Sequence, residues 1–389
     1  MPCHSDRLHC SRRDFLRRGA ALAAGLPFIS PLHSAWADVP AAARTANVAI
    51  SRCRTYSPAE TRAALSQCLD ALGGAGKLVR DKTVTVKINL TGTDFSPYLG
   101  RPVGETFMTH HATVMALLAI FFDAGAKRVR LVESPQSRAS LDEMLSDAGW
   151  DIKAMRALGN VDFENTRNLG QGKTYPRLQV PKGGYMFSSL DLNHSYADTD
   201  VMVSLAKLKR HITAGVTLSM KNMFGLTPNS LYGTEAGSES ATGGRDTLHG
   251  DTPARIPLPG LKPGLPYKDP FTRVPRIIVD ICAARPIDLA IIDGVSAMTG
   301  GEGPWTSQVA KIQLTTPGVI IAGFNPVSTD AVATAVMGYP DPRAARGVHP
   351  FDYCDNHLVL AEQAGLGTAD LTQIDVRGLT IAEAKYQYD

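Results

Sequence analysis

The stretch DVMVSLAKLKRHITAGVTLSMKNMFG, residues 200–225, determines how the rest of the chain is interpreted. Its first half predicts a strand, because Val201, Val203 and Leu205 alternate with smaller or polar neighbours. The strand is followed closely by Lys207, Lys209, Arg210, His211, Lys221 and Asn222. Unpaired charges are costly to bury, and sites in open α/β sheets lie beyond the carboxyl ends of strands. The group therefore predicts a functional site, whereas Arg210 taken alone is interpreted as part of a solvated loop.

The sequence on either side of this stretch predicts an α/β fold. Residues 84–90 alternate as a strand, and an amphipathic helix follows with Val114, Leu117, Leu118 and Phe121 on one face. Another strand follows at 128–133, and strands are again expected at 287–292 and 319–324. Strand, connection, helix and strand in this order build a parallel sheet. We expect two lobes, residues 38–198 and 199–389, built on mostly parallel sheets with flanking helices.

Two helix starts are predicted from capping patterns. Ser57-Pro58-Ala59-Glu60 reads as a capping box with proline at the first helical position. Ser328 is expected to cap a later helix that carries Ala331 and Val332.

The segment 226–272 is rich in glycine, serine, threonine and proline and has weak periodicity. Segments of this length and kind are usually functional loops or disordered inserts. A lid over the basic cluster and a surface excursion are the two interpretations.

Residues 1–37 resemble a twin-arginine export signal. Ser11-Arg12-Arg13-Asp14-Phe15-Leu16 matches the signal, a moderately apolar run follows, and Ala35-Trp36-Ala37 is a suitable cleavage site. The apolar run is too short and too interrupted to make a stable membrane span. We therefore expect the twin-arginine translocase to export the folded protein into the periplasm. An amphipathic first helix is the alternative for this segment.

Charge and cysteine content exclude several classes of function. The leader carries five arginines and two aspartates, so its removal leaves 35 basic and 35 acidic residues among 352. A net charge near zero gives no support for a nucleic-acid partner. Cys53, Cys68, Cys282 and Cys354 form no C-x-x-C pair, which disfavours a sulfur-ligated metal site. Buried free thiols are the simpler interpretation, and a Cys53–Cys68 disulfide is the alternative.

The polar residues at the strand ends supply the candidate site. His211 is the acid–base candidate, because imidazole titrates near neutral pH. Lys221 is interpreted as an anion clamp, a general acid, a covalent cofactor anchor or a surface lysine. The expected substrate-binding side chains are Lys87, Asn89, Lys207, Lys209 and Asn222. Asp293, Glu302 and Asp330 are the candidate ligands for a divalent metal ion, and helix capping is their alternative role.

Several segments resemble the DUF362 family along nearly the whole length after the leader. They include VTVKINL at 84–90, KLKRH with MKNMFG within 205–225, DLAIIDG at 288–294, GGEGP at 300–304 and GVIIAGFNPVSTDAVATAVMG at 318–338. Some members of that family add a cysteine-rich ferredoxin-like segment, which this sequence lacks. The resemblance therefore implies no electron transfer by that route.

A second resemblance is to the nickel-pincer lactate racemase family. His211, Ala214, Gly215 and Lys221 are similar to its H-x-x-A-G-x5-K element. The likeness implies that His211 moves a proton and that Lys221 carries an organic cofactor. It does not extend to a nickel ligand, because no histidine lies between Lys221 and His249.

These features together predict an exported protein with a cleft lined by Lys87, Asn89, His211, Lys221, Asn222 and Asp293. The leading hypothesis is an isomerase-like or racemase-like enzyme that uses acid–base chemistry on a small anionic substrate. A non-catalytic periplasmic protein that binds an anion or a metal is the alternative. A maturation factor for another exported enzyme is the third interpretation.

Overall fold

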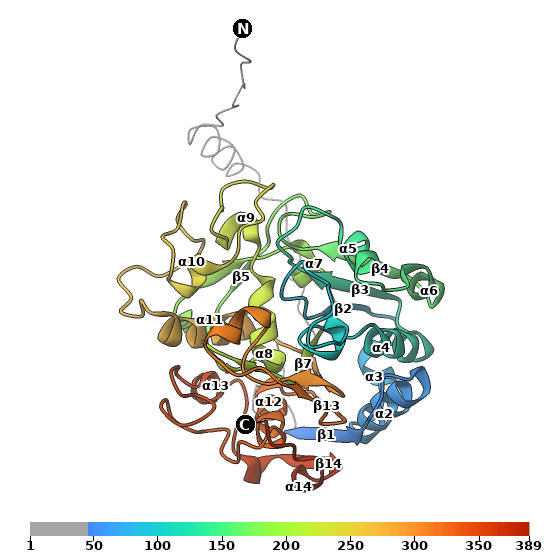
Figure 1. Cartoon of the computed structure of the whole chain (residues 1–389). Helices are drawn as coiled ribbons and strands as arrows, with labels where there is room; N and C mark the ends of the chain where they lie inside the picture. Colours follow the sequence, from blue (N-terminus) through green and yellow to red (C-terminus); the bar gives the residue numbers. More distant parts are fainter. Residues whose placement is uncertain (1–45, 389) are drawn as a thin grey trace. The chain divides into compact units, whose positions relative to one another are not determined.

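A computed structural model describes residues 46–388, and its centre is one eight-stranded sheet (Figure 1). The strand order is β14-β1-β13-β10-β7-β2-β3-β4. In that order the bounds are Asp375–Gly378, Asn47–Arg52, Val319–Gly323, Leu289–Gly294, Val201–Lys207, Thr83–Lys87, Arg128–Glu133 and Val161–Asn165. Only β13 runs against its two neighbours, so the predicted α/β class with a mostly parallel sheet is confirmed.

Strand β7 lies in the middle of the sheet, between β2 and β10. All seven of its residues are buried, including Ser204 and Lys207. A parallel strand covered on both faces does not need polar residues on alternate positions to face water. In β7, Val201, Val203 and Leu205 therefore point to one buried face of the sheet, and the residues between them point to the other buried face. Ser204 shows this, because its hydroxyl donates to the carbonyl of Ser219 on the face that helix α8 covers.

Helices cover both faces of the sheet. The longer ones are α2 (Pro58–Ala71), α4 (His111–Asp123), α11 (Pro270–Ala284) and α12 (Pro326–Val336). Helix α2 packs on the face of β1 that carries Ser51, where the thiol of Cys68 lies 3.2 Å from the serine hydroxyl. Helix α12 packs on the opposite face, against Val48 and Ile50. These two layers bury the sheet and leave its strand ends free to form a site.

The short elements make up the connections. The α-helices are α3 (Gly76–Val79), α5 (Leu141–Asp147), α6 (Ile152–Ala157), α7 (His194–Ala197), α8 (Leu218–Asn222), α9 (Asn229–Tyr232), α10 (Asp246–His249), α13 (His357–Gln363) and α14 (Ile381–Ala384). The 3-10 helices are η2 (Val103–Glu105), η3 (Pro181–Gly183), η4 (Met223–Leu226), η5 (Pro304–Gln308) and η6 (Leu371–Gln373). The two-stranded sheets pair β5 (Arg177–Gln179) with β6 (Ser189–Asp191), β8 (Arg210–His211) with β9 (Gly215–Val216), and β11 (Ala297–Met298) with β12 (Leu314–Thr315).

Two capping predictions need correction. The hydroxyl of Ser57 accepts from the amide of Glu60, but the Glu60 carboxylate binds the Arg54 amide and the Thr55 hydroxyl. Only half of a capping box is therefore formed. Asn325, and not Ser328, caps α12, because the Asn325 side chain accepts from the Ser328 amide and Pro326 opens the helix. The sequence offered both polar residues, and the proline decides between them.

The segment 226–272 is ordered by short helices and by burial of its few apolar side chains. It contains α9 and α10, and Tyr232, Leu248 and Leu258 are buried.

One sheet contains strands from both of the lobes expected from the sequence, residues 38–198 and residues 199–389. The proposed leader lies outside the described residues. None of the helices within 46–388 has the length and apolar character needed to cross a bilayer.

The four cysteines of the described part are buried, and each thiol is free. Cys68 belongs to α2 and Cys282 to α11, so both contribute to the packing of helices on the sheet. Burial raises the pKa of the Cys53 and Cys68 thiols to about 12, which keeps them protonated at neutral pH.

Candidate functional site

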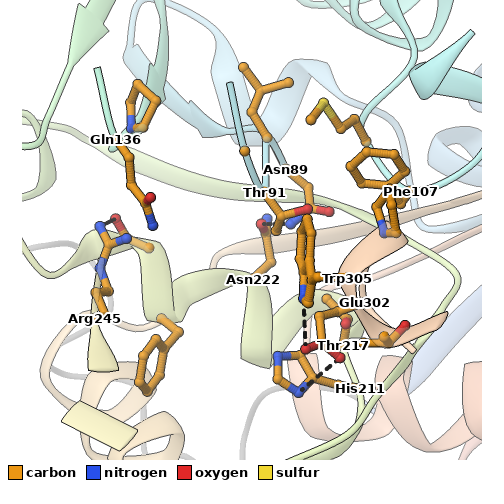
Figure 2. Close-up of a pocket in the computed structure, with 18 of the residues that line it drawn as sticks. Asn89, Thr91, Phe107, Gln136, His211, Thr217, Asn222, Arg245, Glu302 and Trp305 are labelled. Carbon is orange, nitrogen blue, oxygen red and sulfur yellow. Dashed lines mark hydrogen bonds and ion pairs between the residues drawn. The ribbon is translucent and has the colours of Figure 1, made fainter. Parts of the chain in front are cut away.

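A cavity of about 870 Å³ lies at the carboxyl ends of β2 and β3, beside the β8–β9 hairpin that follows β7. Its walls come from the loop after β2, the loop after β3, the β8–β9 hairpin with α8 and η4, helix α10 with the residues on either side of it, and the loop that contains η5. Figure 2 shows Arg245 and Gln136 on one side of the cavity, with Trp305, Glu302 and His211 on the other. Of the predicted site residues, Lys87, Asn89, His211, Lys221, Asn222 and Glu302 line it.

A buried ion pair joins the ends of β2 and β3. The ammonium of Lys87 lies 2.5 Å from Oε1 of Glu133, and it donates to the carbonyl of Ile88 at 2.8 Å. The two side chains are 2% and 4% exposed. Burial lowers the pKa of Lys87, and the carboxylate of Glu133 opposes that shift. The positive charge of Lys87 is thus already compensated by Glu133, and the side chain forms part of the floor of the cavity.

Gly225 at the end of the MKNMFG segment covers this pair. A Cβ atom at Gly225 would lie 2.8 Å from the Lys87 ammonium and 3.1 Å from Oε1 of Glu133. The glycine therefore lets η4 approach the pair closely enough to exclude water.

Asn89 and Asn222 link β2 to α8. The amide nitrogen of Asn89 donates to Oδ1 of Asn222 at 3.0 Å. Asn222 in turn donates to the carbonyl of Lys87 and to the hydroxyl of Ser204. These bonds fix α8 over the end of the sheet, so the position of Lys221, one residue earlier, is also fixed.

Helix α8 is held at its other end by Asp330 of α12. The carboxylate of Asp330 accepts from the amides of Ser219 and Met220, both at 2.9 Å, and from the Ser219 hydroxyl. Burial raises the pKa of Asp330 to about 7, and the three hydrogen bonds oppose that shift. Asp330 therefore orients the helix that carries Lys221 from beneath and has no place in the cavity wall.

His211 lines the cavity with a neutral ring. Its Nδ1 accepts from the amide of Thr213 at 3.2 Å, and burial together with the nearby Lys221 charge moves its pKa well below 6.5. A neutral imidazole that accepts at Nδ1 carries its proton on Nε2. The 3.8 Å contact between Nδ1 and Glu302 is therefore not an ion pair at neutral pH. His211 offers an N–H donor.

Lys221 is an amine without an ion-pair partner among the described residues. Within residues 46–388 its ammonium has neither a hydrogen-bond acceptor nor a carboxylate partner, and it lies 4.1 Å from the centre of the Phe224 ring. Burial lowers the pKa of Lys221 to about 7 despite the opposing charge of Glu302, and Arg245 and Lys87 lower it further. A large fraction of this amine is unprotonated at neutral pH.

Arg245 is a second basic group without an ion-pair partner in residues 46–388, and it was not among the predicted site residues. Its Nη2 donates to the Ser134 hydroxyl at 2.6 Å, and its Nε donates to the Thr227 hydroxyl at 2.8 Å. Its other acceptors are the carbonyls of Ser134, Gly225 and Thr227 and the amide oxygen of Asn229. In the described part of the chain Arg245 has no carboxylate partner, and its Nη1 has no acceptor. Its only signal in the sequence was its place in a long loop that follows the basic cluster.

Lys207, Lys209 and Asp293 do not line the cavity, contrary to their predicted roles. Lys207 donates to the Gly104 carbonyl at 2.5 Å and to Tyr56 at 2.6 Å, and it lies 3.3 Å from Asp293. Lys209 donates to the carbonyls of Phe107 at 2.7 Å and Glu302 at 2.9 Å. Both lysines are completely buried. Their polar partners are protein groups, so these lysines anchor the surrounding loops.

The three carboxylates proposed as metal ligands are bound in three different ways. Asp293 accepts from Tyr56 and Thr113, and Asp330 holds the start of α8. Glu302 alone reaches the cavity, where it accepts from the Ile212 amide at 3.0 Å and from the Trp305 indole at 3.2 Å. The structure does not bring the three together. Residues 46–388 also contain no other cluster of three or more histidine, cysteine or acidic side chains suited to a metal ion.

Comparison with known proteins gives the family. Residues 84–335, more than half of the chain, match the family model described as a domain of unknown function, DUF362. The chain belongs to the DUF362 family. The matched range contains every residue discussed for the cavity. The KLKRH and MKNMFG segments of this DUF362 chain therefore contribute directly to the site, the first through His211 and the second through Lys221 and Asn222.

A more distant relative covers a similar extent of this DUF362 protein. It is a thylakoid-associated protein of Synechocystis sp., which is 24% identical over 296 residues. The alignment covers 75% of this chain and 74% of the relative. The likeness to the lactate racemase family, by contrast, stays a prediction from the His211–Lys221 spacing.

Proposed function

We propose that the cavity binds a small organic anion and that Lys221 and His211 carry out acid–base chemistry on it. The main support for this proposal is that Lys221 and Arg245 line the same cavity and neither forms an ion pair with a carboxylate of the described residues. Lys221 and Arg245 are partly buried. A positive charge withdrawn from water is costly unless it is compensated, and an anionic ligand would supply the missing negative charge. Lys87 makes the contrast clear, since its charge is compensated by Glu133.

Lys221 and His211 have complementary protonation states for proton transfer. The Lys221 amine, with a pKa of about 7, accepts a proton from a carbon next to a carbonyl group of the bound anion. The electron pair of the broken C–H bond moves onto the carbonyl oxygen. The Nε2–H of His211 and the Arg245 guanidinium stabilise that oxygen. Return of the proton from the Lys221 ammonium to the carbon re-forms the C–H bond, so no further reactant is needed. The product is an isomer when the planar intermediate has turned its other face to Lys221 before the proton returns.

An organic cofactor attached to Lys221 and a divalent metal ion were both considered for this site, and the residues of the cavity fit them differently. The unpaired Lys221 amine at the cavity wall would fit a covalently attached organic cofactor, which would act as an electron acceptor when bound; an attached Lys221 would then hold the cofactor in place of acting as the base. A divalent metal ion does not fit, because the described residues provide no cluster of ligands. Intact-mass measurement of natively exported protein tests for an increment on Lys221.

Solvent exchange tests whether the protein is an enzyme. The protein is incubated in D₂O with a panel of 2-oxo and 2-hydroxy carboxylates, and loss of the C–H signal is followed by proton NMR. We expect exchange of at least one of them, because Lys221 equilibrates its proton with water. Binding of an anion without exchange would favour the alternative, a non-catalytic periplasmic binding protein. A co-purified partner enzyme would favour a maturation factor.

The pH dependence of turnover follows from Lys221. Its pKa is lowered to about 7, so the unprotonated, proton-accepting amine increases as the pH rises through 7. We expect kcat/KM to rise about tenfold for each pH unit below 7 and to level off above it. His211 stays neutral across this range and adds no second step. A flat profile between pH 5 and pH 9 would remove Lys221 as the base.

We also propose that the protein acts in the periplasm after folded export. The twin-arginine pattern in residues 1–37 supports this location. The relative named as thylakoid-associated is consistent with function at, or beyond, a membrane. Fractionation of cells that carry Arg12→Lys and Arg13→Lys together should show the protein retained in the cytoplasm.

A further inference from the structure

One wall of the cavity is aromatic and solvent-exposed. Trp305 is 51% exposed although it lines the cavity, and Val309 beside it is 74% exposed. The Trp305 ring meets Phe107 edge to face, with the ring centres 6.0 Å apart, and Phe107 meets Tyr98 in the same way at 6.2 Å. A large aromatic ring exposed in a concave site is a common anchor for a ligand.

The Trp305 ring is held in place and is not simply left in solvent. Its indole nitrogen donates to Glu302 at 3.2 Å, and the same carboxylate accepts from the Ile212 amide. Gly92 passes close to the ring, since a Cβ atom there would lie 3.9 Å from it. The ring therefore has a fixed position relative to His211, which is next to Ile212.

The Arg245 guanidinium lies at a different part of the same cavity. Figure 2 places Arg245 across the cavity from Trp305, with Gln136 near Arg245. A cavity of about 870 Å³ also exceeds what an anion of two or three carbons would fill. The site thus offers a flat apolar surface and a positive group separated by open space.

We propose that the ligand is an aromatic anion, with a planar ring that packs on Trp305 and an anionic carboxylate or phosphate at Arg245. This inference rests on the anion site proposed above and adds the chemical class of the ligand. The atoms between ring and anion then lie beside His211 and Lys221, where the proton is transferred.

Matched ligand pairs test the two ends separately. Affinity is measured by calorimetry for phenyl phosphate against inorganic phosphate, and for phenylpyruvate against pyruvate, while tryptophan fluorescence is recorded. We expect each aromatic member to bind at least about tenfold more tightly than its partner, from ring burial and stacking. In Trp305→Ala the two members of each pair should bind equally, and Trp305→Phe should retain part of the preference. The Trp305→Phe variant also assigns the fluorescence change to this ring.

The outcomes separate this inference from the anion site itself. Equal affinity within both pairs in the unmodified protein would overturn the aromatic class and leave the anion site standing. Failure of all four anions to bind would overturn the anion site. The last probe is phenylacetamide, the neutral amide of phenylacetic acid. If it bound as tightly as phenylpyruvate, the positive groups would contribute nothing to affinity, and the proposal would be overturned. Thermal unfolding of Trp305→Ala should differ little from that of the unmodified protein, because half of the side chain is exposed and its hydrogen bond to Glu302 lies at the surface.

Discussion

Replacement of Lys221 by methionine should abolish turnover and leave the fold intact. The amine makes no hydrogen bond within residues 46–388, so its removal leaves no acceptor unpaired. Its contact with the Phe224 ring is replaced by the methionine side chain, which fills a similar volume and packs well against aromatic rings. Loss of a general base typically costs about 10²–10⁴ in rate. We therefore expect kcat to fall by about a thousandfold and the thermal midpoint to change by no more than about 2 °C. Solvent exchange and calorimetric unfolding measure the two quantities.

Two further variants show what Lys221 does. Lys221→Arg keeps a positive charge but does not lose its proton near neutral pH, so anion affinity should survive while turnover is lost. Lys153→Met, in an exposed position of α6, is the matched control and should change neither. A fall of the thermal midpoint by 10 °C in Lys221→Met would make Lys221 a structural residue. Unchanged turnover would assign the base to another group.

The strand ends could be identified from the sequence, but the faces of the sheet could not. Lys87, Lys207 and Asp293 all occur at carboxyl ends of strands, as predicted. Side chains alternate between the two faces of a strand. The face on which each side chain lies, and the side chain beside it on the next strand, therefore depend on the register of the strands. Lys87 pairs across the sheet with Ser204, whose hydroxyl faces α8, whereas Lys207 pairs with Asp293. The latter pair is therefore buried beneath Tyr56 and α4.

The residues from loops were harder to predict. Arg245 belongs to a segment without periodicity, and only its contacts with Ser134 and Thr227 place it at the cavity. Trp305 was not among the predicted site residues, because the exposure of a single aromatic side chain depends on the fold. His211 and Lys221 were predicted correctly as cavity residues, since a short hairpin and α8 keep them close to the end of β7.

The Lys87–Glu133 pair should be the largest single contribution to stability at the site. Lys87→Met would leave the Glu133 carboxylate buried without a counter-ion, with only the Leu90 and Ser134 amides as donors. Breaking a buried pair on one side typically costs about 3–5 kcal/mol. We expect urea unfolding at pH 7 to show a loss of this size in Lys87→Met.

A second substitution separates charge from packing in this pair. Lys87→Met combined with Glu133→Gln removes the uncompensated charge and keeps the shape of the side chain, so it should be more stable than Lys87→Met alone. Arg62→Met is the control, because the Arg62–Asp123 pair is exposed on both sides. Such surface pairs contribute less than about 1 kcal/mol. If Lys87→Met and Arg62→Met lost equal stability, the Lys87–Glu133 pair would have to be hydrated, and η4 with Gly225 would not exclude water from the cavity floor.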